Sequence, residues 1–482
     1  MSIARNTAFN VVGAIIPLAV SLLTVPIYLK VVGIDRYGVM ALFWALLGLM
    51  GFLNLGMGPS VTQRMATLSA APQEQRAEVF WAALALNLAL GVVGGAIAYL
   101  GGSAYFRLVS DKATEFAREI EQALPFLAMI APLTIVSSVL TGALQGRSEF
   151  LKLNVINGFG SVMMTTAPLV VAILIGPQLK WLVAAGLSAK VIELIWLAAA
   201  CRLAIPLSRV HRPSWAVSRH LLRFGGWVSL SSLLGVLLET TDRFVLGSLR
   251  GLSAVSAYSI PYSLVSKLTI LPLSLSRALL PHASATVDRK QGEQVEINSV
   301  RALTCVISPG SILLLALLGP FMHVWLGDLL AEKSRPVADI LVLGFWANSL
   351  AHIPFVILQA MGKPQSATRL QMIYLIPYFT LLYFAVKWFG PVGAAFAWAA
   401  RSFWDPILFA MTGTARRVFP IVAPSGALVV VSGLIALNFN WRSTSYWLAL
   451  ATLFAMSLLA AAAIAPTRVP LRFKNGNVEP PR

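Results

Sequence analysis

Charged residues are scarce in this sequence: Asp, Glu, Lys and Arg make up 12% of its 482 residues, against roughly 25% in soluble globular proteins. So little charge excludes a soluble globular domain. Hydrophobic residues account for 57% of the chain, and the mean hydropathy is +0.77. Because long apolar runs recur along nearly the whole length, the sequence is that of a multi-pass membrane protein.

Cysteine is almost missing, and so are the common catalytic motifs. Cys201 and Cys305 fall in separate apolar segments, which argues against a disulfide framework and against a cysteine metal site. The chain contains no G-x-x-x-x-G-K-[ST] loop, no H-E-x-x-H motif and only five dispersed histidines. We therefore expect no nucleotide site of the Walker type, no metal and no cofactor.

Acidic residues are outnumbered by basic ones, which gives a formal net charge of +18. In a soluble protein this excess would indicate nucleic acid binding. Here the basic residues sit in short loops between apolar runs. We therefore expect membrane lipids, and no nucleic acid, among the partners.

Fourteen apolar segments are long enough to cross a bilayer as helices, which takes about 20 residues each. They lie at about 7–29, 39–62, 79–102, 123–145, 153–176, 181–203, 224–247, 257–279, 300–322, 337–360, 369–388, 391–413, 421–440 and 444–465. The prediction is an all-α polytopic membrane protein of about 14 transmembrane helices.

Basic residues are distributed unevenly among the loops. The alternate set of loops that includes the N-terminus holds about twice as many Lys and Arg as the other set. Since basic loops are retained in the cytoplasm, both termini are predicted to be cytoplasmic.

The most basic loop, at about 202–223, divides the chain into two halves. A weak internal repeat agrees, because Lys190 with Glu193 and Arg401 with Asp405 fall in the sixth span of each half. The predicted domains are 1–210 with six helices, 211–413 with six more, 414–465 with two extra helices, and a cytoplasmic tail at 466–482.

Ionisable residues inside the predicted spans are the main candidates for function. Each would cost about 2.5 to 3.5 kcal/mol at a lipid-exposed helix centre. Eight such residues cannot all face lipid, so we expect them to line a protein interior or a water-filled cavity. They are Lys190, Glu193, Glu239, Asp242, Arg243, Lys267, Arg401 and Asp405.

Spacing indicates which of these charges can pair on one helix face. The pairs Lys190 with Glu193, Glu239 with Arg243, and Arg401 with Asp405 are three or four residues apart. These pairs either fix helix packing or belong to a transport path. The partner expected for Lys267 is Asp242 or an anion that comes and goes. Lys30 and Arg36, at the end of the first hairpin, either continue that path or are ordinary flanking charges.

Several short motifs resemble the bacterial polysaccharide flippases, the O-antigen and exopolysaccharide repeat-unit translocases of the multidrug/oligosaccharidyl-lipid/polysaccharide exporter superfamily. The motifs are residues 6–10 (NTAFN), 32–38 (VGIDRYG), 53–58 (LNLGMG) with Arg64 downstream, 241–247 (TDRFVLG) followed by Ala257 and Tyr258, and 390–395 (GPVGAA). The likeness covers nearly the whole chain. One departure is Asn54, which stands where relatives frequently carry Asp.

The resemblance implies two six-helix bundles around a central cavity, with two helices appended. It also implies a substrate, a polyprenyl pyrophosphate that carries a short glycan, and protein partners in the polysaccharide polymerase and chain-length machinery of the inner membrane. The candidate pyrophosphate or sugar contacts are then Arg243, Lys267, Arg401 and Lys190, continued by Lys30 and Arg36. The candidate charge partners or ion-coupling acids are Glu239, Asp242, Asp405 and Glu193.

Two other functions compete with this interpretation. A cation-coupled multidrug or metabolite antiporter of the same superfamily would be expected to have 12 helices and a more acidic cavity. An integral-membrane glycan polymerase or ligase would be expected to carry a sizeable catalytic loop, whereas the longest outside connection here, about 103–122, is short. The sequence therefore predicts a transporter and not an enzyme.

Overall fold

The computed structural model describes residues 17, 19–68, 72–109, 115–204, 215–273, 275, 289–361 and 364–465. All regular elements in these ranges are helices. Helices are expected where lipid is the solvent, because a helix satisfies its own backbone N–H and C=O groups. The start of the first predicted span, the tail at 466–482 and the 6–10 motif lie outside the described residues.

The chain forms two compact units, Met1–Ser259 and Ile260–Arg482. Unit 1 begins with a short apolar helix, Ala19–Val31. Its other elements are α2 (Ile34–Met50), the 3-10 helix η1 (Gly51–Asn54), α3 (Met57–Thr67), α4 (Gln73–Val109), α5 (Glu115–Gly146), α6 (Phe150–Leu174), α7 (Leu179–Ala204) and α8 (Trp215–Arg250). The next helix, α9 (Leu252–Val265), contains the unit boundary.

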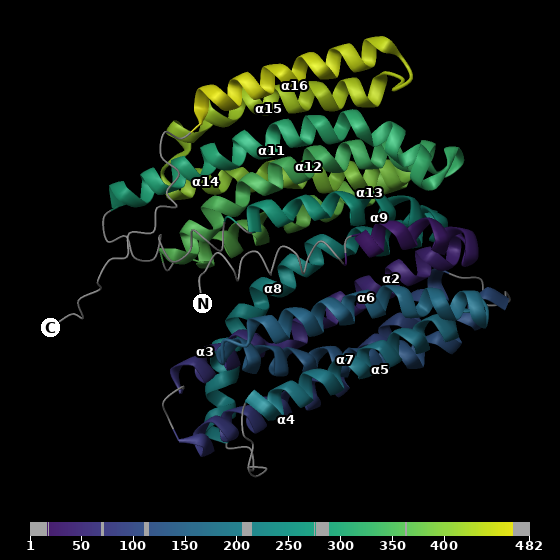
Figure 1. The fold of residues 1–482 in the computed structure, drawn as a ribbon, viewed down its shortest axis with the longest axis vertical. Helices are drawn as coiled ribbons and strands as arrows, with labels where there is room; N and C mark the ends of the chain where they lie inside the picture. Colours follow the sequence, from purple (N-terminus) through teal and green to yellow (C-terminus); the bar gives the residue numbers. More distant parts are fainter. Residues whose placement is uncertain are drawn as a thin grey trace. The chain divides into compact units, whose positions relative to one another are not determined.

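Unit 2 continues from α9 through a second 3-10 helix. Its last two long helices, α15 and α16, form a hairpin that packs on α11 (Figure 1). The elements are η2 (Ser266–Thr269), α11 (Arg289–Leu326), α12 (Asp328–Ala360), α13 (Pro364–Trp404), η3 (Asp405–Ile407), α14 (Leu408–Thr412), α15 (Ala415–Asn438) and α16 (Thr444–Ile464).

The predicted fold class is confirmed. Ten helices among the described residues are long and apolar enough to cross a membrane. One of these, Gln365–Thr412, which comprises α13, η3 and α14, extends over two of the predicted spans. Gly390 lies between those spans with φ 57° and ψ −130°, a conformation that glycine adopts without a steric penalty. Pro391 follows and is well suited to start the next helix. The predicted division near residue 210 stays a prediction, and residues 205–214 lie outside the described ranges.

Close packing of α4 on α5 depends on two glycines four residues apart. A Cβ added to Gly91 would lie 2.8 Å from Cα of Pro132, and one added to Gly95 would lie 2.7 Å from the carbonyl oxygen of Ala128. The backbones therefore approach more closely than any side chain allows, which is the expected role of a GxxxG pair in a membrane helix.

Replacing Gly95 with valine is expected to destabilise unit 1, because the new side chain would press on the backbone of α5. Overpacking of this kind costs about 1 to 3 kcal/mol. The measurement is thermal unfolding of the purified protein in detergent. The matched control is Gly101→Val in the same helix, where an added Cβ meets nothing within 4 Å. Equal unfolding temperatures for the two variants would contradict the packing role.

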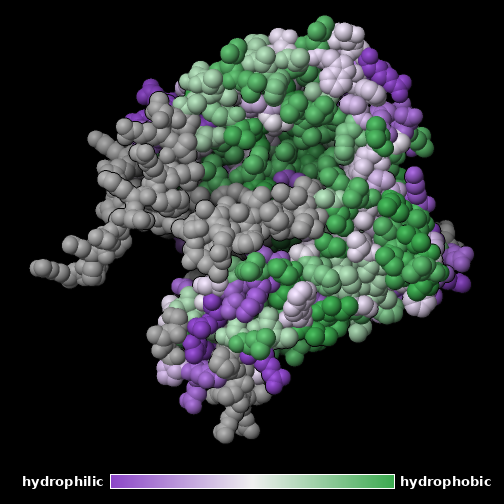
Figure 2. Space-filling model, viewed as in Figure 1, coloured by the Kyte–Doolittle hydropathy of each residue, from purple (hydrophilic) through white to green (hydrophobic). Residues whose placement is uncertain are grey.

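Apolar side chains cover much of the visible surface (Figure 2). Large examples are Val324, which is 91% exposed, and Leu203, which is 83% exposed. Polar groups, in contrast, are found inside: Asp242 and Asn87 are both 0% exposed. Exposed apolar side chains are expected on helices surrounded by lipid, and the few polar groups in their spans are expected to face the protein interior.

Candidate functional site

The buried carboxylate of Asp242 lies on α8 in unit 1. One of its oxygens accepts a hydrogen bond from the hydroxyl of Tyr258, and the other accepts one from the backbone N–H of Arg243 at 2.7 Å. Nη1 of Arg243 lies 3.9 Å from the same oxygen, so this contact is an ion pair longer than a hydrogen bond. The family-like TDRFVLG segment thus places an acid and a base side by side, with the acid fixed by a tyrosine.

Glu239 and Arg243, which the sequence places one turn apart on the same helix, are in contact. Nη1 of Arg243 donates a hydrogen bond of 2.9 Å to the backbone carbonyl oxygen of Glu239, while the Glu239 residue is exposed. The i, i+4 spacing brought the two residues together as expected.

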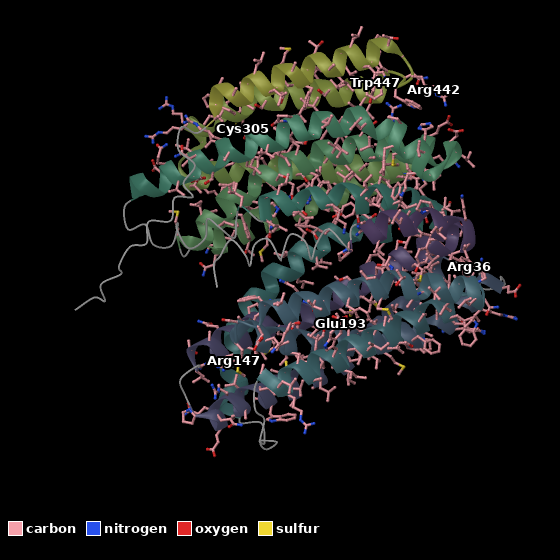
Figure 3. All side chains as sticks on the ribbon, in the orientation of Figure 1. Arg36, Arg147, Glu193, Cys305, Arg442 and Trp447 are labelled. Atoms are coloured by element: carbon pink, nitrogen blue, oxygen red, sulfur yellow. The ribbon has the colours of Figure 1, made fainter. Side chains whose placement is uncertain are left out.

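Lys190 and Glu193 form the pair that their spacing predicts. Their side chains lie 3.0 Å apart on α7 and are 12% and 11% exposed. Glu193 lies against Gly160 of α6, where an added Cβ would come within 2.6 Å of the carboxyl carbon. Figure 3 shows Glu193 between Arg36 and Arg147, which lie at opposite ends of unit 1. The pair is therefore deep in the bundle.

Removing only the acid of this pair should be costly. Glu193→Ala leaves the Lys190 ammonium buried without its counter-charge, which is expected to cost about 3 kcal/mol. The double variant Lys190→Met/Glu193→Met removes both charges and should recover most of that stability, measured by thermal unfolding in detergent. Because Lys190 is a candidate substrate contact, the folded double variant should still export less glycan than the wild type. Full export by that variant would make the pair purely structural.

Arg36 is held in a hydrogen-bonded ion pair that sequence analysis missed. Its Nε and Nη2 atoms each donate a bond of 3.0 Å to the carboxylate of Glu119 on α5. The same carboxylate accepts a bond of 2.5 Å from the backbone N–H of Leu179 at the start of α7. These contacts connect the N-terminal ends of α2, α5 and α7, so Arg36 helps to hold these three helices in place. Lys30, the other predicted cation of this hairpin, is exposed.

Asn54 belongs to a buried amide and hydroxyl network at the end of η1. Its Oδ1 atom accepts bonds from Nδ2 of Asn87 at 3.0 Å and from Oγ of Ser138 at 2.6 Å. Leu55 and Gly56, which follow η1, both have positive φ. The predicted second span is therefore broken here, and its broken end is fixed by polar contacts with α4 and α5.

Arg401 and Asp405 form the corresponding pair in unit 2. Nη1 of Arg401 lies 3.9 Å from Oδ2 of Asp405, and the side chains are 6% and 10% exposed. Asp405 also accepts hydrogen bonds from the Tyr374 hydroxyl at 2.8 Å and from Nδ2 of Asn348 at 3.3 Å. The guanidinium lies 5.5 Å from the centre of the Trp398 ring, a cation–π distance. The acid is again held by a tyrosine, and the base is again at ion-pair distance.

Lys267 lies on η2, in the middle of the predicted eighth span, and is exposed. Among the described residues no salt bridge to Lys267 is found within 4.0 Å. Of the two partners expected for this residue, the Asp242 carboxylate already accepts hydrogen bonds from Tyr258 and from the backbone.

Three predicted spans contain a 3-10 turn, and each turn carries a polar residue: Asn54 on η1, Lys267 on η2 and Asp405 on η3. A 3-10 stretch inside a helix often marks a functional hinge. Broken helices also frame substrate sites in many transporters. In sequence, Gly51 and Pro406 were the available signals of a break at η1 and η3.

Sequence analysis also missed two buried acids in unit 2. Asp339, 1% exposed on α12, lies 3.6 Å from Arg335 one turn earlier. Glu296, 1% exposed on α11, accepts bonds from Thr412 and Thr414 at 2.9 and 3.0 Å. Among the described residues no group of three or more His, Cys, Asp or Glu side chains is arranged to hold a metal ion.

Comparison with known protein families shows which family this chain belongs to. A family model described as polysaccharide biosynthesis protein matches residues 3–287, which is more than half of the chain. The chain belongs to the polysaccharide biosynthesis protein family. A second model, MatE, matches residues 228–389 of this family member, so the resemblance seen in the short motifs is confirmed.

A relative in Shigella flexneri carries the name "Putative O-antigen transporter". It is 27% identical over 408 residues, which cover 85% of this polysaccharide biosynthesis protein and 97% of the relative. Two solved structures of similar fold are likewise named as a transporter and as a flippase.

Two solved structures share the fold. An inward-facing multidrug resistance transporter of the MATE family, in the MOP superfamily, has a TM-score of 0.73 at 16% identity and covers 85% of this chain and 98% of its own. The lipid II flippase MurJ, in an inward closed conformation, has a TM-score of 0.72 at 13% identity and covers 94% and 98%. At these identities the likeness establishes the fold: this polysaccharide biosynthesis protein has the architecture of the MOP superfamily.

Proposed function

We propose that this protein translocates a polyprenyl-pyrophosphate-linked oligosaccharide repeat unit from the cytoplasmic to the outer leaflet of the bacterial inner membrane, by alternating access, for surface polysaccharide synthesis. Family membership and the relative named for O-antigen transport support this proposal. The loop charges support an orientation with both termini in the cytoplasm. A polysaccharide polymerase and the chain-length machinery are the proposed protein partners.

One observation carries the proposal: in the described part of each unit, an arginine lies beside a carboxylate that accepts a hydrogen bond from a tyrosine. Asp242 with Tyr258 stands beside Arg243, and Asp405 with Tyr374 stands beside Arg401. Each guanidinium has a nitrogen 3.9 Å from one oxygen of its carboxylate. A guanidinium has five N–H donors in a fork that suits phosphate oxygens, so these two groups are the best equipped to bind a pyrophosphate.

The other candidate cations differ in how firmly they are held. Lys190 is hydrogen-bonded to Glu193, and Arg36 is hydrogen-bonded twice to Glu119. Lys267 and Lys30 are exposed. We propose Arg243, Lys267 and Arg401 as the principal contacts to the pyrophosphate, Lys190 as a sugar or phosphate contact, and Lys30 and Arg36 as a continuation of the path.

The acids are proposed as charge partners or as ion-coupling groups. Asp242, Asp405, Glu193 and Glu239 each lie within one helical turn of a candidate cation. One elementary charge moved through 100 mV supplies about 2.3 kcal/mol, enough to bias release more than tenfold. With no Walker-type loop in the sequence, we propose an ion gradient or removal of the product as the energy source.

A cation-coupled antiporter is the second candidate function. The MatE match over residues 228–389 and the MATE neighbour favour it. Its substrate would be an organic cation, which needs unpaired acids more than bases. In the described residues Asp242 and Asp405 are both within 4.0 Å of an arginine, which favours an anionic substrate.

The test is a strain that lacks this gene, assayed for lipid-linked repeat units. The proposal predicts that single units accumulate on the cytoplasmic leaflet and that surface polysaccharide is lost. Complete but unpolymerised units on the outer leaflet would contradict the proposal and indicate a defect in polymerisation. Unchanged polysaccharide together with new sensitivity to cationic drugs would support the antiporter.

A further inference from the structure

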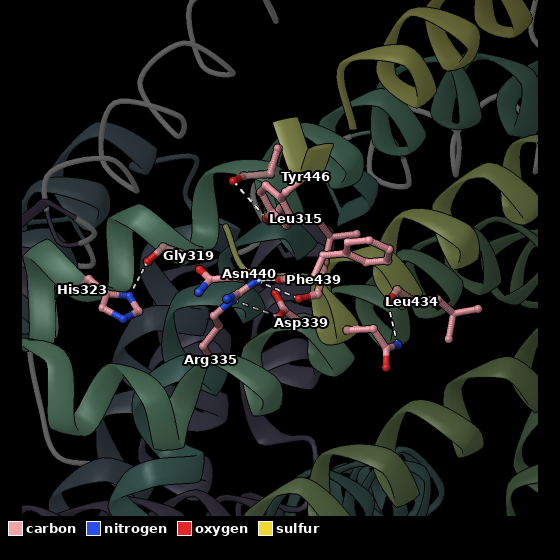
Figure 4. A network of polar contacts seen from close by, with 12 residues as sticks. Leu315, Gly319, His323, Arg335, Asp339, Leu434, Phe439, Asn440 and Tyr446 are labelled. Atoms are coloured by element: carbon pink, nitrogen blue, oxygen red, sulfur yellow. Dashed lines mark hydrogen bonds and ion pairs between the residues drawn. The ribbon is translucent and has the colours of Figure 1, made fainter. Parts of the chain in front are cut away.

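A polar pocket lies in unit 2 at the end of its last hairpin. Figure 4 shows four of its lining residues, His323, Arg335, Asp339 and Asn440, within a network of polar contacts. Its volume is about 410 Å³, within the range of small-molecule sites. It lies where α11 turns into α12 at Gly327 and where α15 turns into α16. None of the candidate transport residues lines it, so it is separate from the pairs of Lys190 with Glu193, Arg243 with Asp242 and Arg401 with Asp405.

One wall is a stripe of charge along α12. Asp328, Glu332, Arg335 and Asp339 follow at helical spacing and all line the pocket. At the deep end Arg335 lies 3.6 Å from Asp339 and donates a hydrogen bond of 2.7 Å to the carbonyl oxygen of Ala436. These contacts fix the deep end. At the rim, Asp328 and Glu332 are exposed and present two carboxylates.

The opposite wall comes from the turn between α15 and α16. Arg442 is exposed, and its guanidinium lies 5.3 Å from the centre of the Trp441 ring. Trp441 is in turn 5.2 Å from the ring of His323 on α11. The backbone N–H of Arg442 donates a bond of 3.0 Å to Oδ1 of Asn440, which shapes the turn. The lining of the pocket therefore includes an exposed guanidinium together with two exposed carboxylates.

The position of the pocket along the helices is that of the membrane interface. Of the helices at the pocket, α15 and α16 have 24 and 21 residues, about the length that crosses a bilayer, so the turn between them is expected where the hydrocarbon ends. Large apolar side chains beside the pocket are exposed, with Val324 at 91% and Leu329 at 77%. Trp447 is also exposed and lies near Arg442 at this hairpin (Figure 3), and aromatic residues are enriched at membrane interfaces.

We propose that this pocket binds a phospholipid headgroup that carries both a phosphate and a primary ammonium. Arg442 pairs with the phosphate, and Asp328 and Glu332 accept hydrogen bonds from the ammonium. The exposed apolar surface of α11 and α12 around Val324 and Leu329 then receives the acyl chains. A bound lipid would brace the hairpin of α15 and α16 against α11 and α12.

The charges of the lining residues favour a zwitterionic headgroup over a purely anionic or a purely cationic ligand. A purely anionic headgroup would be repelled by Asp328 and Glu332, and a purely cationic ligand would be repelled by Arg442 and Arg335. A mixed set of rim charges is complementary to a zwitterion. A quaternary ammonium has no N–H to donate to the carboxylates, so a primary amine is preferred.

The experiment is native mass spectrometry of the full-length, delipidated protein titrated with phosphatidylethanolamine, phosphatidylcholine or phosphatidylglycerol. We expect phosphatidylethanolamine to be retained most. The double variant Asp328→Asn/Glu332→Gln should reduce that retention about five-fold, towards the level of phosphatidylcholine, and Arg442→Gln should reduce it as well. The matched control is Lys333→Gln, an exposed charge on the same helix that does not line the pocket. Thermal unfolding verifies that each variant is folded.

Several results would overturn the proposal. Equal retention of the three lipids would show that the pocket does not discriminate between headgroups. Wild-type retention by the folded double variant would show that the rim acids are not involved. Displacement of the lipid by free O-phosphoethanolamine at comparable concentration would identify a soluble ligand, and binding of a free oligosaccharide in place of the lipid would identify a sugar site. None of these results bears on translocation itself.

Discussion

Replacing Lys267 with alanine should lower the rate of surface-glycan export about 10- to 100-fold. The Lys267 ammonium is exposed on η2, in the middle of a predicted span. A hydrogen bond from a charged group to a phosphate is worth about 1.5 to 3 kcal/mol, and each 1.4 kcal/mol is a factor of ten. The measurement is the initial rate at which export recovers when the variant is expressed in the deletion strain.

This substitution separates transport from folding. Because Lys267 is exposed and no described acid lies within 4.0 Å of it, truncation leaves no buried charge behind. The variant should reach the membrane at the wild-type level and unfold at the wild-type temperature. Lys333→Ala, an exposed lysine of unit 2 with no proposed transport role, serves as the control and should export normally. Wild-type export by Lys267→Ala would remove this residue from the proposed path.

Loss of Arg401 should have the larger effect, with export reduced at least about 100-fold. A guanidinium that binds pyrophosphate through two N–H groups makes two charge-assisted hydrogen bonds, so it contributes about 3 kcal/mol or more. Arg401→Lys keeps the charge but loses the planar fork, and should recover only part of the rate. The readout is again export in the deletion strain, normalised to the amount of protein in the membrane.

Folding must be controlled more strictly here, because Arg401 is 6% exposed in its side chain. Arg401→Ala alone leaves the Asp405 carboxylate without its cation, although Tyr374 and Asn348 still donate to it. The neutral double variant Arg401→Gln/Asp405→Asn avoids an uncompensated charge. It should fold and insert yet export poorly. Normal export by the double variant would mean that the pair serves only to pack α13.

Much of the helical architecture could be predicted, because a chain segment surrounded by lipid has few alternatives to an α-helix. A stretch of about 20 apolar residues must be helical to satisfy its backbone, and the helices α4 to α7 fall where the hydropathy places them. Their ends were harder to predict. In α12 the helix begins at Asp328, about two turns before the predicted span, because charged residues at an interface can continue a helix that hydropathy alone would end.

Pairings within one helix were also predictable, since three- and four-residue spacings bring side chains together. Lys190 with Glu193 and Arg401 with Asp405 are paired as expected. Contacts between distant segments were not: Arg36 meets Glu119, which is 83 residues away, and Tyr374 of α13 meets Asp405 of η3, which is 31 residues away. A single sequence contains no spacing rule for such contacts, because they depend on how helices pack.

The breaks at η1 and η2 were the least predictable features. Asn54 and Lys267 occur in segments apolar enough to be read as continuous spans. A 3-10 turn is favoured there by local backbone geometry, such as the positive φ of Leu55 and Gly56 after η1. Hydropathy does not report this geometry, although glycines and prolines mark where it is permitted.

Transbilayer movement of a lipid-linked oligosaccharide in proteoliposomes that contain only this purified protein tests the central claim most directly. The account predicts that glycan in the inner leaflet becomes accessible to a membrane-impermeant lectin or glycosidase, and that it stays protected when the vesicles contain Arg401→Gln/Asp405→Asn. Glycan that stays protected with the wild-type protein, in vesicles where the same protein exchanges an organic cation for protons or sodium, would contradict it.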